Sequence, residues 1–291
     1  MPALPPRLAG LLLAIAAPLC WSVGGVVIRT VDAEPWDIVF WRSAGHAIFF
    51  PFALWAFWGR SAYVEARAAG FAALAVAAFI TATFVFHVLA MTATTVANVL
   101  ILQSMSPLLV AVLAWVLLGE RLTVASIIAL IVAFSGLLIV VGGSLGGGGT
   151  LGNLFAIIVA FCSASHVTIV RHHRARNLAA VTLISGAAAA VIAVPFSAPF
   201  ALSFEDIVLL AALGGVQMTL GLTFFIMALR RLPAAEVTLI AILEPVFGPI
   251  WVWLAVGEQP ADSTLIGGAI VLVALVGHVI VAARRSQSTN S

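Results

Sequence analysis

The chain alternates long apolar runs with short breaks that contain charged residues, glycine or proline, and this pattern constrains its fold more than any other feature. Each run holds about 20 residues, which as a helix rising 1.5 Å per residue crosses a hydrocarbon core of about 30 Å. The bilayer core offers no water to backbone amides, so each run is expected to be an α-helix. We place ten runs, at residues 8–28, 37–58, 70–91, 95–118, 124–142, 151–171, 178–200, 206–229, 234–256 and 263–283.

The composition fits a chain that lies mostly in lipid. Hydrophobic residues make up 63% of the sequence and charged residues only 8%, whereas about a quarter of the residues in a soluble domain are charged. The two cysteines, Cys20 and Cys162, lie inside apolar runs and give neither a disulfide framework nor a metal-ligand spacing. No lysine occurs, which excludes Schiff-base chemistry. We expect no cofactor, no metal and no nucleic-acid partner.

The arginines predict the orientation of the chain, because arginine and lysine are retained on the cytoplasmic side of a membrane. If the amino terminus is cytoplasmic, eleven of the thirteen arginines fall on the inner side, and only Arg29 and Arg42 lie towards the outside. We therefore expect a multi-pass protein of the bacterial inner membrane with both termini in the cytoplasm. An even number of spans agrees with that placement.

The sequence repeats itself internally. A shift of 142 residues aligns Cys20 with Cys162 and Arg29 with Arg171. A shift of 138 residues aligns further pairs, which are Ala97 and Ala235, Pro107 and Pro245, Trp115 and Trp253, Gly119 and Gly257, and Glu120 and Glu258. Each half contains five runs, an odd number, so the second half must enter the membrane in the opposite orientation. The pattern predicts two inverted five-helix repeats.

The predicted fold is an all-α integral membrane protein with ten transmembrane helices around a central cavity. The first repeat covers residues 1–141, a glycine-rich linker covers 142–150, and the second repeat covers 151–291. Inverted repeats are typical of secondary transporters, in which two halves rock to expose a midplane site to either side of the membrane. We expect the linker to permit that motion.

Only two formally charged residues fall well inside the predicted spans, Arg42 in the second and Glu244 in the ninth. A charge at the bilayer centre costs about 3 kcal/mol on insertion scales, so each should face the protein interior or water. Glu244 precedes Pro245, which frees a backbone carbonyl of the helix. These charges either form a substrate or proton site, or Glu244 pairs locally, for example with Arg42, and joins helices. Both readings stay open.

Other polar and aromatic side chains within the runs extend the candidate site. Histidines can exchange protons near neutral pH, glutamines can both donate and accept hydrogen bonds, and deep tryptophans can form an apolar wall or a cation-π face. The alternative for each is helix packing or an interhelical hydrogen bond. The complete predicted substrate-binding set is Trp21, Arg42, His46, His87, Gln103, His166, Gln217, Glu244 and Trp251.

Two segments resemble the paired signatures of the EamA family of the drug/metabolite transporter superfamily. One is Pro107 with residues 108–122, and the other is Leu243-Glu244-Pro245 leading to Gly257-Glu258. Gly257-Glu258-Gln259-Pro260 departs slightly from the usual form of the second signature. The resemblance covers both halves and implies an exporter of small metabolites. Members similar in length and aromatic content include exporters of aromatic and other neutral amino acids.

We therefore expect a secondary transporter that exports amino acids and related small metabolites by alternating access, with the lipid bilayer and a small-molecule substrate as its partners. Alternatives are an exporter of other metabolites or drugs, an intramembrane enzyme, or a channel. No HExxH or Gly-x-Ser-x-Gly motif supports an enzyme. A channel would favour matching polar residues, but Gln103 aligns with Ala241 and Glu244 with Ser106. Proton coupling and oligomeric state stay open.

Overall fold

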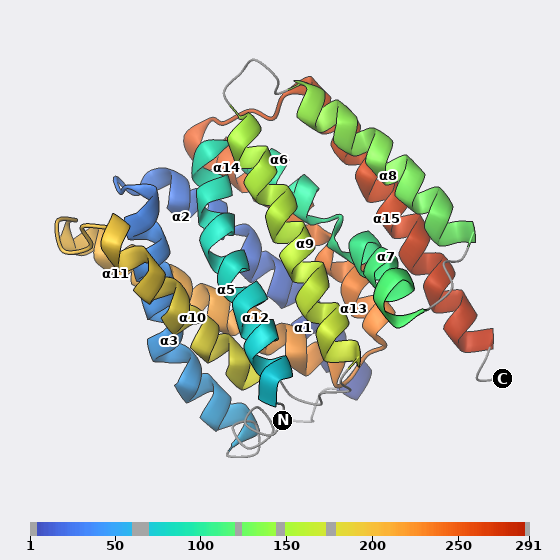
Figure 1. Cartoon of the computed structure of the whole chain (residues 1–291), viewed down its shortest axis with the longest axis horizontal. Coiled ribbons are helices and arrows are strands. Elements are labelled where there is room, and N and C mark those ends of the chain that lie inside the picture. Colours follow the sequence, from blue (N-terminus) through green and yellow to red (C-terminus); the bar gives the residue numbers. More distant parts are fainter. Residues whose placement is uncertain (1–4, 60–69, 120–123, 144–148, 173–178, 289–291) are drawn as a thin grey trace.

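Helices make up all the regular structure in the part of the chain that the computed structural model describes, residues 5–59, 70–119, 124–143, 149–172 and 179–288 (Figure 1). Eight helical segments in these ranges are long and apolar enough to cross a membrane. They confirm eight of the predicted runs. The run at 37–58 forms a 24-residue helix whose mean hydropathy is lowered by Arg42 and His46, and the run at 178–200 forms a shorter apolar helix.

The first half of the chain contains seven of the labelled helices. They are α1 (Pro6–Ser22), α2 (Gly24–Thr30), α3 (Pro35–Trp58), α5 (Gly70–Ala93), α6 (Val96–Gln103), α7 (Ser106–Leu118) and α8 (Val124–Gly143). Because α8 continues to Gly143 and the next helix begins at Thr150, helical structure extends into both ends of the predicted 142–150 linker.

The second half contains the remaining helices. They are α9 (Thr150–His172), α10 (Ala179–Ala193), the 3-10 turn η1 (Val194–Phe196), α11 (Phe204–Ala212), the π-helical segment η2 (Leu213–Met218), α12 (Thr219–Leu229), α13 (Ala234–Ala241), α14 (Leu243–Val256) and α15 (Asp262–Ser288). The segments α11, η2 and α12 follow one another without a loop and together form one span.

Two of the predicted runs are broken at equivalent positions of the sequence repeat. The helix α6 ends at Gln103 and α13 ends at Ala241, which is 138 residues later. A proline follows each break, at Pro107 and Pro245, and proline cannot donate a backbone hydrogen bond to the preceding turn. The helices α7 and α14 both end at a glycine with a left-handed backbone, Gly119 and Gly257. The sequence duplication is therefore also present in the backbone.

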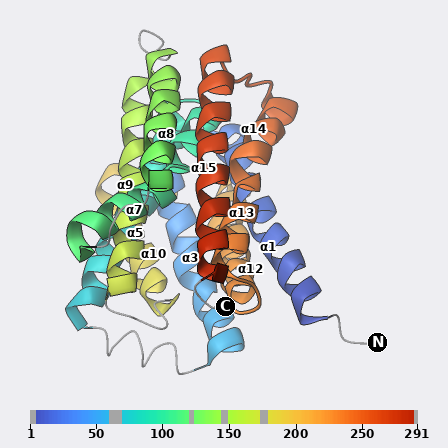
Figure 2. The ribbon, with the colours of Figure 1, turned by 90° about the vertical axis from the view of Figure 1, so that its right-hand side faces the viewer.

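The helices α8 and α15 form a pair that packs side by side along its length at one edge of the molecule (Figures 1 and 2). Gly136 and Gly267 allow this approach, because a Cβ atom built on Gly136 would lie 2.6 Å from the backbone oxygen of Gly267. In the rest of the bundle, α5 packs against α9 and α10, α3 against α10, and α1 against α12 and α14. Small residues at helix interfaces are typical of membrane bundles.

Contacts at the helix ends show the direction in which each segment runs. At one end of the bundle, Glu258, just after α14, accepts a hydrogen bond from the backbone N–H of Val96 at the start of α6. At the other end, Arg7 at the start of α1 pairs with Glu236 at the start of α13 at 3.6 Å. The helix α1 begins, and α15 ends, at the same end of the bundle (Figure 2).

Gly214 in η2 gives a direct test of this packing. A Cβ atom there would overlap the backbone carbonyl of Arg42 on α3, so Gly214→Ala should lower the free energy of unfolding by about 1–3 kcal/mol. The measurement is the thermal unfolding midpoint in detergent. Gly142→Ala is the control, since nothing lies within 4 Å of its Cβ position. A native midpoint for Gly214→Ala would contradict the packing of η2 against α3.

Candidate functional site

A cavity of about 330 Å³ lies among helices of both halves, and we call it the chamber. Its walls come from α1, α2, α3, α5, α6, α9, α10, η2, α12 and α14. Seven of the nine predicted site residues line it, and these are Trp21, Arg42, His87, Gln103, His166, Gln217 and Glu244. Residues up to 223 positions apart in the sequence are thus brought to one space.

Arg42 and Glu244 face the chamber without pairing with each other. Ion pairs among the described residues join Arg7 to Glu236 and Arg29 to Glu258, and neither Arg42 nor Glu244 takes part in one. The Nε atom of Arg42 is buried and has no hydrogen-bond partner. The two opposite charges therefore share one cavity without forming an ion pair with each other.

The helix break before α14 explains the position of Glu244. Glu244 lies in the first turn of α14, and a carboxylate there is stabilised by the positive end of the helix dipole. Pro245 follows it within the first turn of α14, where proline is tolerated because the backbone N–H groups of that turn have no partner inside the helix. A broken helix in mid-membrane is tolerated where its backbone is buried in protein or lines a cavity.

Two chamber residues already contact each other across neighbouring helices. The Nδ1 atom of His87 on α5 lies 3.1 Å from the side-chain amide of Gln103 on α6. This contact is the interhelical hydrogen bond that was one of the alternatives for Gln103. Both residues also line the chamber. Within the described ranges, no group of three or more His, Cys, Asp or Glu residues gathers as metal ligands would.

Gln217 connects the π-helical segment to the break in the first span. Its Nε2 donates hydrogen bonds to the backbone carbonyls of Cys20 at 2.8 Å and Trp21 at 3.0 Å, close to where α1 gives way to α2. Its Oε1 is buried and has no hydrogen-bond partner. Single π-helical turns often occur at functional sites. The side-chain amide of Gln217 is thus fixed by the hydrogen bonds of its nitrogen, while its oxygen accepts none.

The structure places the other two predicted residues, His46 and Trp251, behind the chamber wall. His46 is fully buried, with its Nδ1 3.3 Å from Thr219 Oγ1 and its ring edge-on to Phe84, which does line the chamber. Trp251 donates from Nε1 to Ser22 Oγ at 3.1 Å, and Ser22 lines the chamber. Both residues therefore position wall residues instead of forming the wall.

The sequence analysis missed several polar residues of the wall, among them Thr83, Ser163 and Thr182. Helical spacing could have found two of them. Thr83 precedes His87 by four residues on α5, and Ser163 precedes His166 by three on α9, so each shares a helix face with a predicted residue.

A second hollow of about 210 Å³ adjoins the chamber. It shares Gln103, Ser163 and Glu244 with the chamber and extends to the two helix breaks at Ser104 and Ile242. The points where the fourth and ninth runs are interrupted therefore lie beside a hollow that borders the chamber at Gln103 and Glu244.

Comparisons with known proteins agree with this architecture. The family model described as the EamA-like transporter family matches the chain twice, over residues 8–142 and 150–280. Among 16 matching chains of solved structures, a crystal structure of a protein superimposes with a TM-score of 0.66 and 19% sequence identity, over 96% of this chain and 99% of that chain. That likeness shows a shared fold. No curated protein matches the sequence.

The chamber predicts a sharp contrast between two engineered cysteines in a background without Cys20 and Cys162. Ser163→Cys lines the chamber and should react with a small hydrophilic thiol reagent, whereas Thr223→Cys is fully buried in α12 and should react at least about tenfold more slowly. Labelling rates in detergent, read by mass spectrometry, give the comparison. Equal rates would mean that water does not enter the space beside Ser163.

Proposed function

This chain belongs to the EamA-like transporter family, and we propose that it is a secondary transporter that exports amino acids and related small metabolites across a bacterial inner membrane. The family match and the eight apolar spans establish a multi-pass membrane transporter. The cargo and the mechanism are our inference from the chamber.

One observation carries the proposal, the presence of unpaired Arg42 and Glu244 in a single chamber. An amino acid carries a carboxylate and an ammonium on one carbon atom. The guanidinium of Arg42 offers a fork of donors to a carboxylate, and the carboxylate of Glu244 accepts from an ammonium. A zwitterion would supply both partners at once, which would offset the cost of holding two unpaired charges within the bundle.

The remaining chamber residues fit the rest of such a substrate. Gln217 adds an amide to the chamber wall, held there by the hydrogen bonds of its Nε2 to Cys20 and Trp21. Trp21, Phe84 and Met91 provide apolar surface for a side chain. A volume of about 330 Å³ lies at the small end of ligand pockets, which span about 300–1,000 Å³. The size favours a small metabolite over a drug-sized cargo.

We also propose that the chain crosses the membrane ten times as two inverted repeats. The eight apolar spans, together with α3 and α10, make ten. The start of α6 meets the end of α14, whereas the start of α13 meets the start of α1, which supports opposite directions for equivalent helices. The arginine distribution supports cytoplasmic termini, so we assign the Arg29 end of the bundle to the outside.

Alternating access follows as the mechanism from a chamber built between two such halves. Amino acids would enter from the cytoplasm and leave at the Arg29 end. The helix breaks after Gln103 and Ala241 divide the fourth and ninth runs at the chamber, so their outer and inner parts can change angle separately.

The two charges give the test of cargo recognition. Arg42→Gln and Glu244→Gln should each reduce counterflow of a radiolabelled neutral amino acid in proteoliposomes by about tenfold or more, because one charged end of the zwitterion loses its partner. Glu205→Gln makes the same chemical change on an exposed residue of α11 and should transport normally. Native counterflow in both chamber variants would refute the proposed site.

A further inference from the structure

We propose that Arg29 and Glu258 form the outer gate of the chamber and that this structure shows the gate closed. The inference rests on the proposed transport function and orientation. It goes beyond them by naming the contact that must break before the chamber opens to the outside.

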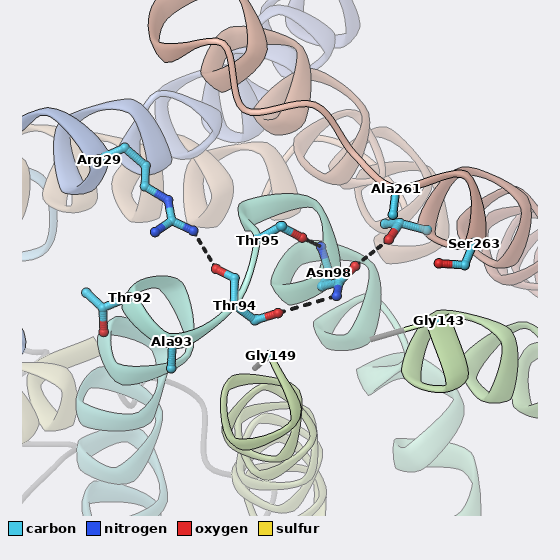
Figure 3. A pocket seen from close by; sticks show the side chains of 11 residues that line it. Arg29, Thr92, Ala93, Thr94, Thr95, Asn98, Gly143, Gly149, Ala261 and Ser263 are labelled. Carbon is cyan, nitrogen blue, oxygen red and sulfur yellow. Dashed lines mark hydrogen bonds between the residues drawn. The ribbon is translucent and has the colours of Figure 1, made fainter. Parts of the chain in front are cut away.

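The pair connects four segments of the chain at one end of the bundle. The Nε atom of Arg29, in the last turn of α2, lies 2.8 Å from Glu258 Oε2, just after α14. A terminal nitrogen of the same guanidinium donates to the backbone carbonyl of Thr94, after α5 (Figure 3). The other oxygen of Glu258 accepts from the N–H of Val96, the first residue of α6, at 2.8 Å. One ion pair thus joins α2 to the ends of α5, α6 and α14.

Two cavities lie close to Arg29. One is a hollow of about 430 Å³ that includes Arg29 and Thr92 in its lining, and we call it the outer hollow because it lies at the Arg29 end of the bundle (Figure 3). Their sequence neighbours Ile28 and Met91 line the chamber instead. At α2 and α5, residues adjacent in the sequence therefore line the outer hollow and the chamber.

Apolar contacts complete the barrier next to the pair. Val96 and Val252 are almost fully buried, and Gly25 on α2 lies against both of them. A Cβ atom at Gly25 would lie 2.8 Å from Val96 and 3.1 Å from Val252, so no larger residue fits without movement. We infer that the two cavities join when α2 moves away from α6 and α14, and this movement separates Arg29 from both Glu258 and Thr94.

A neighbouring polar cluster shows why the ion pair is the contact that opens. Asn98 on α6 bonds to Asn153 on α9 at 3.2 Å and accepts from Thr264 on α15, and all three residues are buried. Separating them would leave buried amides without partners, which costs about 1–3 kcal/mol per group. The side chains of Arg29 and Glu258 are 23% and 21% exposed, so water already reaches part of each and can replace part of their contact when they separate, whereas the three residues of the polar cluster are buried. The amide cluster therefore stays together while the ion pair separates.

The experiment measures access to the chamber from each side of the membrane. Ser163→Cys, in a background without Cys20 and Cys162, is labelled with a membrane-impermeant thiol reagent in intact cells and in inverted membrane vesicles. Adding Glu258→Gln should make labelling from the outside about tenfold faster and labelling from the inside slower, because the closed state loses its ion pair and the population shifts. Arg29→Gln should act in the same direction.

Glu236→Gln is the matched control, since it removes the ion pair with Arg7 at the opposite end of the bundle and should not speed labelling from the outside. Unchanged outside labelling in both gate variants would overturn the proposal. So would faster labelling from both sides, which indicates loosened structure. The labelling needs no substrate, so its outcome is independent of the cargo. If the gate variants label faster from the outside but the native protein shows no amino-acid counterflow, the proposed cargo is refuted and the gate is supported.

Discussion

Charge is expensive inside a bilayer, and the architecture of this transporter follows from where its few charges are kept. Glu244 lies in an apolar span and Arg42 in the 24-residue helix α3, both face one chamber, and neither forms an ion pair with another described residue. Maintaining them requires a polar cavity between the two halves, a helix start at Glu244 and close packing of η2 against α3. The chamber is thus the condition under which these two charges can be present at all.

The arrangement of charges differs between the chamber and the Arg29 end of the bundle. At the chamber the opposite charges stay apart, whereas Arg29 and Glu258 are in contact and tie helix ends together. Paired charges near the surface can separate into water with little loss, and unpaired charges in the interior favour a ligand that pairs with both. We infer that the paired charges of Arg29 and Glu258 serve opening, and that the unpaired charges of Arg42 and Glu244 serve substrate recognition.

The sequence predicted the helices well because apolar length alone determines what can cross a bilayer. It did not predict the breaks at Val23 and Ser104 or the π-helical turn, since these depend on local tertiary contacts within unbroken apolar runs. Charge and polarity located most chamber residues. They could not predict that His46 and Trp251 lie behind the chamber wall, because tertiary packing sets the rotation of each helix about its own axis.

The central claim is that the chamber recognises both the carboxylate and the ammonium group of one amino acid. Competition by substrate analogues, measured with the native protein, tests this claim most directly. Proteoliposomes loaded with a labelled neutral amino acid are challenged with that amino acid, its amide, which lacks the carboxylate, and its N-acetyl form, which lacks the ammonium. The account predicts that each blocked analogue competes at least about tenfold more weakly than the zwitterion. Equal competition by either analogue would contradict recognition by Arg42 and Glu244 together.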